Sequence, residues 1–135
     1  MSTSGDDGNM LDELAHFDLE REIADAAQKK PWPSGIHSRT LFKKPDFRLV
    51  LIAMEPAARM HEHHADGTLS VQVLKGEISL GIQGRTYDLR AGNLLTLGAS
   101  LKHEVQSRED SAFLLTIAWP PGEKLLAMQH RGYGT

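Results

Sequence analysis

The feature that most constrains the fold of this 135-residue chain is a series of short apolar segments separated by turns at intervals of about 8–12 residues. Glycine or acidic residues mark several of these turns, at positions 75–76, 83–84, 91–92 and 109–110. About eight short strands in such a series indicate an all-β sandwich or barrel. The predicted strands are Ile36–Phe42, Phe47–Met54, Ser70–Leu74, Glu77–Ile82, Arg85–Leu89, Leu94–Leu97, Glu104–Ser107 and Ala112–Trp119.

The remaining residues divide into three segments around this barrel. Residues 1–10 are polar and acidic, and we expect a disordered leader because they bury too little apolar surface to offset the entropy of ordering. Residues 11–31 carry apolar side chains at helical spacing up to Pro31, which predicts an N-terminal α-helix, either continuous or broken near residues 16–18. Residues 32–120 would form the barrel and residues 121–135 a surface tail.

Composition excludes several classes of site and partner. The chain has no cysteine, which rules out disulfides, thiolate nucleophiles and iron–sulfur clusters. Its formal net charge of −3 argues against a nucleic-acid partner, because phosphate binding needs clustered positive charge. The sequence shows neither an apolar run of about 18 residues nor a signal-peptide core, so we expect no membrane partner and a cytoplasmic location.

Three of the seven histidines stand close together, at positions 61, 63 and 64. Residues two apart in a regular strand share a face, so His61 and His63 could present their imidazoles side by side, with His103 as a third donor from a later strand. His64 is a second-tier candidate, because the turn that follows it could redirect its side chain. Neutral imidazoles suit a divalent transition metal such as Fe, Mn, Zn, Ni or Cu. The alternative is a solvated polar loop at the rim of the barrel.

The segment from Pro56 to His103 resembles the cupin superfamily. Within it, residues 71–97, with the sequence VQVLKGEISLGIQGRTYDLRAGNLLTL, resemble the family's strand–turn–strand pattern. The two glycine turns at Gly76 and Gly92 carry the resemblance, and His103 stands where the second cupin motif places a metal-binding histidine. The resemblance implies a small single-domain cupin of the conserved-barrel type, in which a double-stranded β-helix, or jelly-roll barrel, holds a site in its mouth. It also implies a homodimer, which would cover the apolar stripe of the N-terminal helix.

The first cupin motif departs from the family pattern. When the motif is aligned on Gly76, the family's glutamate falls on Leu69. Only one histidine of the cluster then occupies a ligand position, His63 in the shorter spacing and His64 in the longer one. The second motif has changed as well, with Gly98 in place of a proline and Ser100 in place of a glycine. The inherited ligand set is therefore rearranged.

Other polar residues lie within the predicted strands. An inward arginine at Arg39 or Arg48 could bind a substrate carboxylate through two hydrogen bonds, although an exposed charge on an edge strand is the simpler interpretation. His37 belongs to the same group of early strand residues. Gln72 alternates with the apolar residues on either side of it and is expected to face away from the barrel interior.

Two classes of function fit these residues. The first is a barrel that binds a small molecule, and that also holds a divalent metal if its histidines supply enough ligands. The second is a three-histidine metal-dependent enzyme of the dioxygenase, isomerase or decarboxylase type, with Glu62 or Glu104 as general base. A dimerising or sensory barrel without a working site is a third interpretation. Whether the chain is an enzyme stays open at this point, because function depends on the site and not on the fold.

Overall fold

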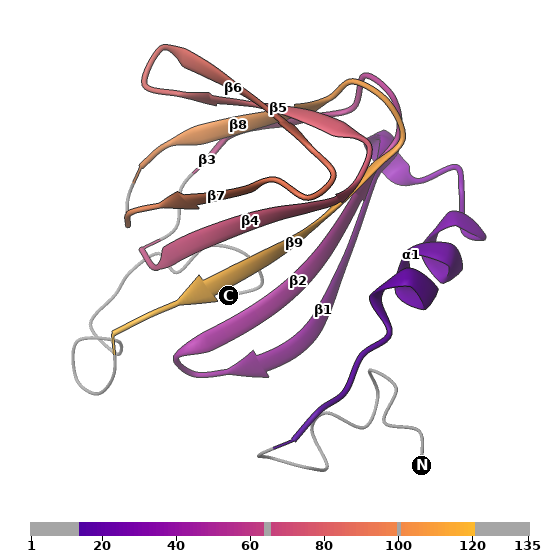
Figure 1. The fold of residues 1–135 in the computed structure, drawn as a ribbon, viewed down its shortest axis with the longest axis horizontal. Helices are drawn as coiled ribbons and strands as arrows, with labels where there is room; N and C mark the ends of the chain where they lie inside the picture. Colours follow the sequence, from indigo (N-terminus) through magenta and orange to yellow (C-terminus); the bar gives the residue numbers. More distant parts are fainter. Residues whose placement is uncertain (1–13, 64–65, 100, 121–135) are drawn as a thin grey trace.

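The computed structural model describes residues 14–63, 66–99 and 101–120 of the protein (Figure 1). Within these ranges the chain forms one α-helix, one 3-10 turn and nine β-strands. The elements are α1 (Leu19–Ala27), η2 (Pro33–Gly35), β1 (Ile36–Lys44), β2 (Phe47–Met54), β3 (Arg59–His63), β4 (Thr68–Lys75), β5 (Glu77–Ile82), β6 (Arg85–Arg90), β7 (Leu94–Leu97), β8 (His103–Ser107) and β9 (Ser111–Ala118).

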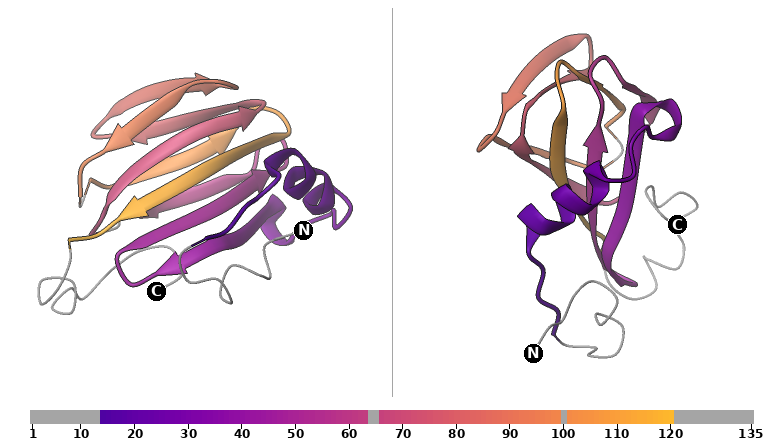
Figure 2. Two further views of the ribbon diagram at one scale, coloured as in Figure 1. Left: turned by 60° about the horizontal axis from the view of Figure 1, so that its bottom comes forward. Right: turned by 90° about the vertical axis from the view of Figure 1, so that its right-hand side faces the viewer.

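The strands form two antiparallel sheets that pack face to face (Figure 2). The five-stranded sheet has the order β1-β2-β9-β4-β7, and the four-stranded sheet has the order β3-β8-β5-β6. Strands that are distant in sequence thus become neighbours, and the chain crosses repeatedly between the sheets. The arrangement is a jelly-roll β-barrel with an N-terminal helix, which confirms the predicted fold class. Strand β3 is an addition to the predicted series.

Short connections determine which strand ends lie together. Residues 64–67 join β3 to β4, and residues 98–102 join β7 to β8, so all four strands meet at one end of the barrel. We call it the His103 end, after the first residue of β8. The β4–β5 turn at Gly76 and the β8–β9 turn lie at the opposite end. In Figure 1 the strands fan out toward the His103 end and converge toward the opposite end.

Alternate residues of each strand point between the sheets and form the main core. In β4, Leu69, Val71 and Val73 are buried in this core, whereas Gln72 between them is exposed. The predicted outward position of Gln72 is therefore confirmed. Residues from both sheets contribute to the core, so neither sheet buries its apolar face without the other.

Helix α1 is shorter than the predicted helix over residues 11–31. It begins at Leu19, because the Asp18 side chain caps it by accepting a hydrogen bond from the backbone N–H of Arg21 at 3.2 Å, and it ends at Ala27. Residues 14–18 and 28–31 are not helical, so the prediction of a continuous helix over residues 11–31 was wrong at both ends. The predicted leader and tail lie outside the described residues. In the part of the chain that the structure describes, no helix has the length and apolar character needed to cross a membrane.

Helix α1 and the segment after it pack on the outer face of the five-stranded sheet. Ala26 and Trp32 form a small cluster with Ala53 of β2 and Ala112 of β9. The Trp32 indole N–H donates a hydrogen bond to the Ala26 carbonyl at 3.0 Å, which fixes the helix to the chain that follows it. The helix is thus anchored outside the barrel, near the end opposite His103.

Two glycines in strand turns allow a matched test of how tightly the opposite end is packed. Gly76 and Gly84 both have a φ of 78°. A Cβ atom at Gly76 would collide with the Asp110 carbonyl oxygen and with the Ser111 side chain, whereas a Cβ atom at Gly84 would meet no atom within 4 Å. We expect Gly84→Ala to lower the free energy of unfolding by about 1–2 kcal/mol, the cost of a left-handed alanine.

For Gly76→Ala we expect at least about twice that loss, because steric overlap adds to the backbone strain. Urea denaturation of the two variants and the wild type measures both values. Equal losses in the two variants would show that the turn at Gly76 yields without cost.

Candidate functional site

His103 lies inside the barrel at the start of β8 and is only 1% exposed. It shares the inner face of β8 with Val105 and Ser107, which are also buried. The ring Nδ1 lies 3.0 Å from the Leu101 carbonyl oxygen. Because a carbonyl oxygen only accepts hydrogen bonds, Nδ1 carries the proton, and in the neutral ring Nε2 carries the lone pair. His103 therefore has a fixed tautomer, with Nε2 as its acceptor or metal-binding nitrogen.

The backbone register places His63 directly opposite His103. The two residues pair across β3 and β8, and His103 also pairs with Ile82 of β5 on its other side. Residues paired in this way have Cβ atoms about 4.5–5.5 Å apart on one face of the sheet. Two of the predicted ligand positions, 63 and 103, are thus neighbours in the sheet, although the side chain of His63 lies outside the described residues.

The expectation that His61 and His63 share one face of a regular strand does not hold. Met60 pairs with Val105 and His63 pairs with His103, so β3 has one residue more than β8 in this stretch. Such a β-bulge breaks the simple alternation of faces, so the argument from residues two apart does not hold here. His61 falls within this stretch and is exposed. His64, the second-tier candidate, lies outside the described residues.

The inner surface at the His103 end is apolar. Leu69, at the position of the family's glutamate, is 2% exposed and pairs with Ile117 of β9 and Leu97 of β7. All three side chains are buried in the main core, as is Ile82 beside His103. Among the described residues, no group of three or more histidine or carboxylate side chains could hold a metal ion.

Arg48 is the principal functional candidate that the sequence interpretation placed wrongly. It is 2% exposed and belongs to β2, which lies between β1 and β9 and is not an edge strand. It alternates with Val50 and Ile52 of the main core, so it lies on the inner face. Its guanidinium carbon lies 5.1 Å from the ring centroid of Trp119. Alternation in the sequence could not have identified it as an inward residue, because Leu49, Leu51 and Ala53 on the other face of β2 are apolar as well.

The other polar candidates lie on the outer surface. Arg39 forms an ion pair with Glu22 of helix α1 at 3.1 Å. Glu104, a predicted general base, forms a partly exposed ion pair with Arg59 at 3.5 Å. The ring of His37 stacks on Trp32 with a centroid separation of 5.7 Å. None of these three contacts lies between the sheets, and the side chain of Glu62 is outside the described residues.

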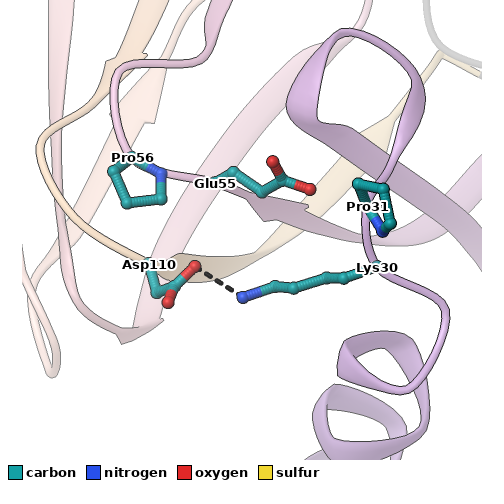
Figure 3. A pocket seen from close by; sticks show the side chains of 5 residues that line it. All are labelled: Lys30, Pro31, Glu55, Pro56 and Asp110. Atoms are coloured by element: carbon teal, nitrogen blue, oxygen red, sulfur yellow. Dashed lines mark hydrogen bonds and ion pairs between the residues drawn. The ribbon is translucent and has the colours of Figure 1, made fainter.

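A separate groove lies at the opposite end of the barrel (Figure 3). It has a volume of about 380 Å³ and is lined by Lys30, Pro31, Glu55, Pro56 and Asp110. Lys30 and Asp110 form an ion pair of 2.7 Å across it, while Glu55 accepts a hydrogen bond from the Trp32 backbone at 2.8 Å. The charged groups of this groove therefore hold the segment after α1 against the barrel.

Comparison with known families identifies the chain. A family model described as the AraC-like ligand-binding domain matches residues 48–131, more than half of the sequence. The chain belongs to this family. The resemblance of this AraC-like domain to the cupin superfamily is confirmed as well, because its jelly-roll barrel is shared with many cupin structures. Among curated proteins, none matches the chain.

Solved structures support the fold of the AraC-like domain. A cupin superfamily protein from Desulfitobacterium hafniense is 16% identical with a TM-score of 0.64, over 70% of this chain and 87% of that one. A conserved protein of unknown function from Streptococcus pyogenes is 22% identical with a TM-score of 0.63, over 67% of this chain and 80% of that one. A cupin domain of an XRE-family transcriptional regulator from Enterobacter cloacae is 22% identical with a TM-score of 0.58, over 64% of this chain and 99% of that one.

The environment of His37 predicts a pH dependence of stability. Burial, followed by the charges of Lys29 and Arg39, lowers the pKa of His37 below its ordinary value of 6.5. The unfolded chain then binds the proton more tightly than the folded one, so the free energy of unfolding falls as the pH drops below about 6.5. We expect His37→Gln to reduce this loss, as measured by urea denaturation at pH 7.5 and pH 5.5. His16→Gln, at an exposed histidine before helix α1, is the control. The same loss in all three proteins would contradict the assignment.

Proposed function

We propose that this AraC-like domain is a binding module for a small organic molecule, with its site between the two sheets at the His103 end. The observation that carries the proposal is the buried His103, whose Nδ1 is held by the Leu101 carbonyl at 3.0 Å. This bond fixes the ring in one orientation and makes Nε2 the nitrogen for a donor group of a ligand. A histidine fixed in this way is a recognition element on a rigid strand.

The surroundings of His103 favour an organic ligand. Leu69, Leu97, Ile117 and Ile82 supply apolar surface, and Arg48 adds a polar group on the facing sheet. Small-molecule sites typically combine mostly apolar walls with a few fixed polar groups. The replacement of the family's glutamate by Leu69 shifts the balance further from metal coordination toward apolar contact. The description of the matching family, and the regulator domain among the structural neighbours, favour binding over catalysis.

A divalent metal at the same end is the second candidate, favoured by the pairing of His63 with His103. Metal-binding histidines commonly donate their other ring N–H to a carbonyl group, as His103 does to Leu101. His61 and His64 are the proposed further ligands for Fe, Mn, Zn, Ni or Cu. Such a metal would supply Lewis-acid chemistry to the alternative enzymatic function. Binding of Zn²⁺ by the wild type and by His37→Gln but not by His103→Gln would support this candidate.

The predicted homodimer stays a proposal. Leu94 is 61% exposed on β7, the edge strand of the five-stranded sheet, and Tyr87 is 36% exposed on β6, the edge strand of the other sheet. Apolar side chains on two edge strands are the kind of surface that a second copy of the chain could cover.

The binding site can be located by NMR with a fragment set of neutral and charged single-ring compounds, including benzamide and benzoate. We expect fragments that bind to shift the indole N–H of Trp119 and the methyl groups of Ile82 and Leu97 at the His103 end. The indole N–H of Trp32, outside the five-stranded sheet, should not respond. We also expect His103→Gln to weaken binding and His37→Gln to leave it unchanged. Binding confined to the Trp32 side, or absence of any binding at the His103 end, would refute the proposed site.

A further inference from the structure

We propose that helix α1 and residues 28–32 detach from the barrel as one unit when His37 is protonated, while the barrel stays folded. We call this unit the N-terminal clasp. It lies outside the five-stranded sheet at the end opposite His103, so the inference goes beyond the proposed function and does not depend on it (Figure 2). Three features of the clasp support the proposal, namely its small buried surface, the stack of His37 on Trp32 and the positive charge around that stack.

The clasp buries little apolar surface against the sheet. Of the nine residues of α1, Ala26 is the one that is buried, and it packs with Trp32 and with two alanines of β2 and β9. A cavity of about 10 Å³ remains in this interface, with Ile23, Ala27 and Trp32 among the residues that line it. A helix of this length is not stable in water without tertiary packing, and burial of one alanine contributes little. The apolar contacts alone therefore hold the clasp weakly.

Two ion pairs add to the attachment of the clasp. Glu22 of α1 pairs with Arg39 of β1 at 3.1 Å, and Lys30 pairs with Asp110 of the β8–β9 turn at 2.7 Å. The Lys30 and Asp110 side chains are partly exposed, as is that of Arg39, so water and salt weaken both pairs. A single added charge can then shift the equilibrium between the docked and the detached clasp.

His37 of β1 is a titratable group in direct contact with the clasp. Its ring stacks on the Trp32 ring with a centroid separation of 5.7 Å and an angle of 29° between the ring planes. Trp32 is 8% exposed and belongs to the cluster that joins α1 to the sheet. The Lys30 ammonium already lies 5.1 Å from the centroid of the same indole ring. Protonation of His37 would therefore place a second cation against this ring.

The charges around the stack are already positive in sum before His37 is protonated. The charged groups that contact the clasp or lie around it are Glu22 and Lys29 from α1 and its end, Lys30, Arg39 of β1, Glu55 after β2, Lys75 of β4 and Asp110 of the β8–β9 turn. All three carboxylates in this set already have a partner, because two form the ion pairs and Glu55 accepts a hydrogen bond from the Trp32 backbone N–H at 2.8 Å. A proton on His37 thus adds to an excess of positive charge.

These surroundings favour the neutral ring while the clasp is docked. Burial, followed by the charges of Lys29 and Arg39, lowers the pKa of His37 below its ordinary value of 6.5. When the clasp detaches, water surrounds the ring, and its pKa returns toward the ordinary value. The detached state then binds the proton more tightly than the docked state, so its population rises as the pH falls below about 6.5.

Hydrogen exchange followed by NMR distinguishes detachment of the clasp from unfolding of the barrel. The Trp32 indole N–H donates to the Ala26 carbonyl at 3.0 Å, so its exchange reports the opening of the clasp. The backbone N–H of Leu115, a buried residue of the inner strand β9, reports the barrel. Each rate is divided by the intrinsic rate of the same group at that pH, which gives a protection factor. At pH 7.5 we expect Trp32 to be at least about tenfold less protected than Leu115, because a local opening costs less than global unfolding.

Acidification and variants then test the role of His37. Between pH 7.5 and pH 5.5 we expect the protection factor of Trp32 to fall by at least about twofold in the wild type and in His16→Gln, and to stay constant in His37→Gln. Lys29→Glu places a negative charge beside His37 and should reduce the fall, whereas Lys43→Glu, at an exposed lysine near the β1–β2 turn, should leave it unchanged. If His37→Gln fails to fold, the two lysine variants decide the question.

Three results would overturn the inference. Equal protection of Trp32 and Leu115 would show that the clasp opens only when the barrel unfolds. A fall of the same size in the wild type and in His37→Gln would exclude His37 as the trigger. Higher protection of Trp32 at pH 5.5 would show that the protonated ring strengthens the stack on the indole instead of releasing it. The proposed ligand site at the His103 end is tested separately, by fragment binding, and stands or falls independently of these results.

Discussion

The rest of the structure depends on the face-to-face packing of two antiparallel sheets that bury their inner surfaces against each other. Because every second residue of each strand points into this space, almost all inner positions must be apolar for the barrel to close. The core meets this requirement from Met54 at one end to Ile117 near the other. His103 and Arg48 are buried at the His103 end of this apolar interior. Their positions near the ends of strands allow polar groups to be buried without breaking the core.

The contacts that stabilise the barrel and the proposed binding site lie at opposite ends of the molecule. At the opposite end, the Ser107 hydroxyl accepts from the Ala58 N–H at 3.1 Å, and the Gly76 turn packs tightly on Ser111. Helix α1 and the Lys30–Asp110 ion pair reinforce that same region from outside (Figure 3). The His103 end carries the loops that connect β3 with β4 and β7 with β8. A scaffold fixed at one end can present recognition residues at the other on rigid strands.

The features that could be predicted from the sequence are those that follow from the alternation of inward and outward residues along the strands. The strand series, the glycine turns, the outward Gln72 and the barrel class all followed from local patterns that the sheets preserve. The bulge in β3 could not be predicted, because one extra residue leaves no compositional trace, and it separates His61 from the regular pattern. The burial of Arg48 depends on β2 lying between β1 and β9, which is a long-range property of the topology. The start of helix α1 was set by the cap at Asp18, not by the apolar periodicity.

The central claim is that a small organic ligand binds between the two sheets at the His103 end of the barrel. The most direct measurement is a crystal structure of the protein grown with the fragment that binds most tightly in solution. The account predicts density for the fragment between the sheets at the His103 end. It would be contradicted if the interior held no ligand while the fragment occupied the groove between Lys30 and Glu55 at the opposite end.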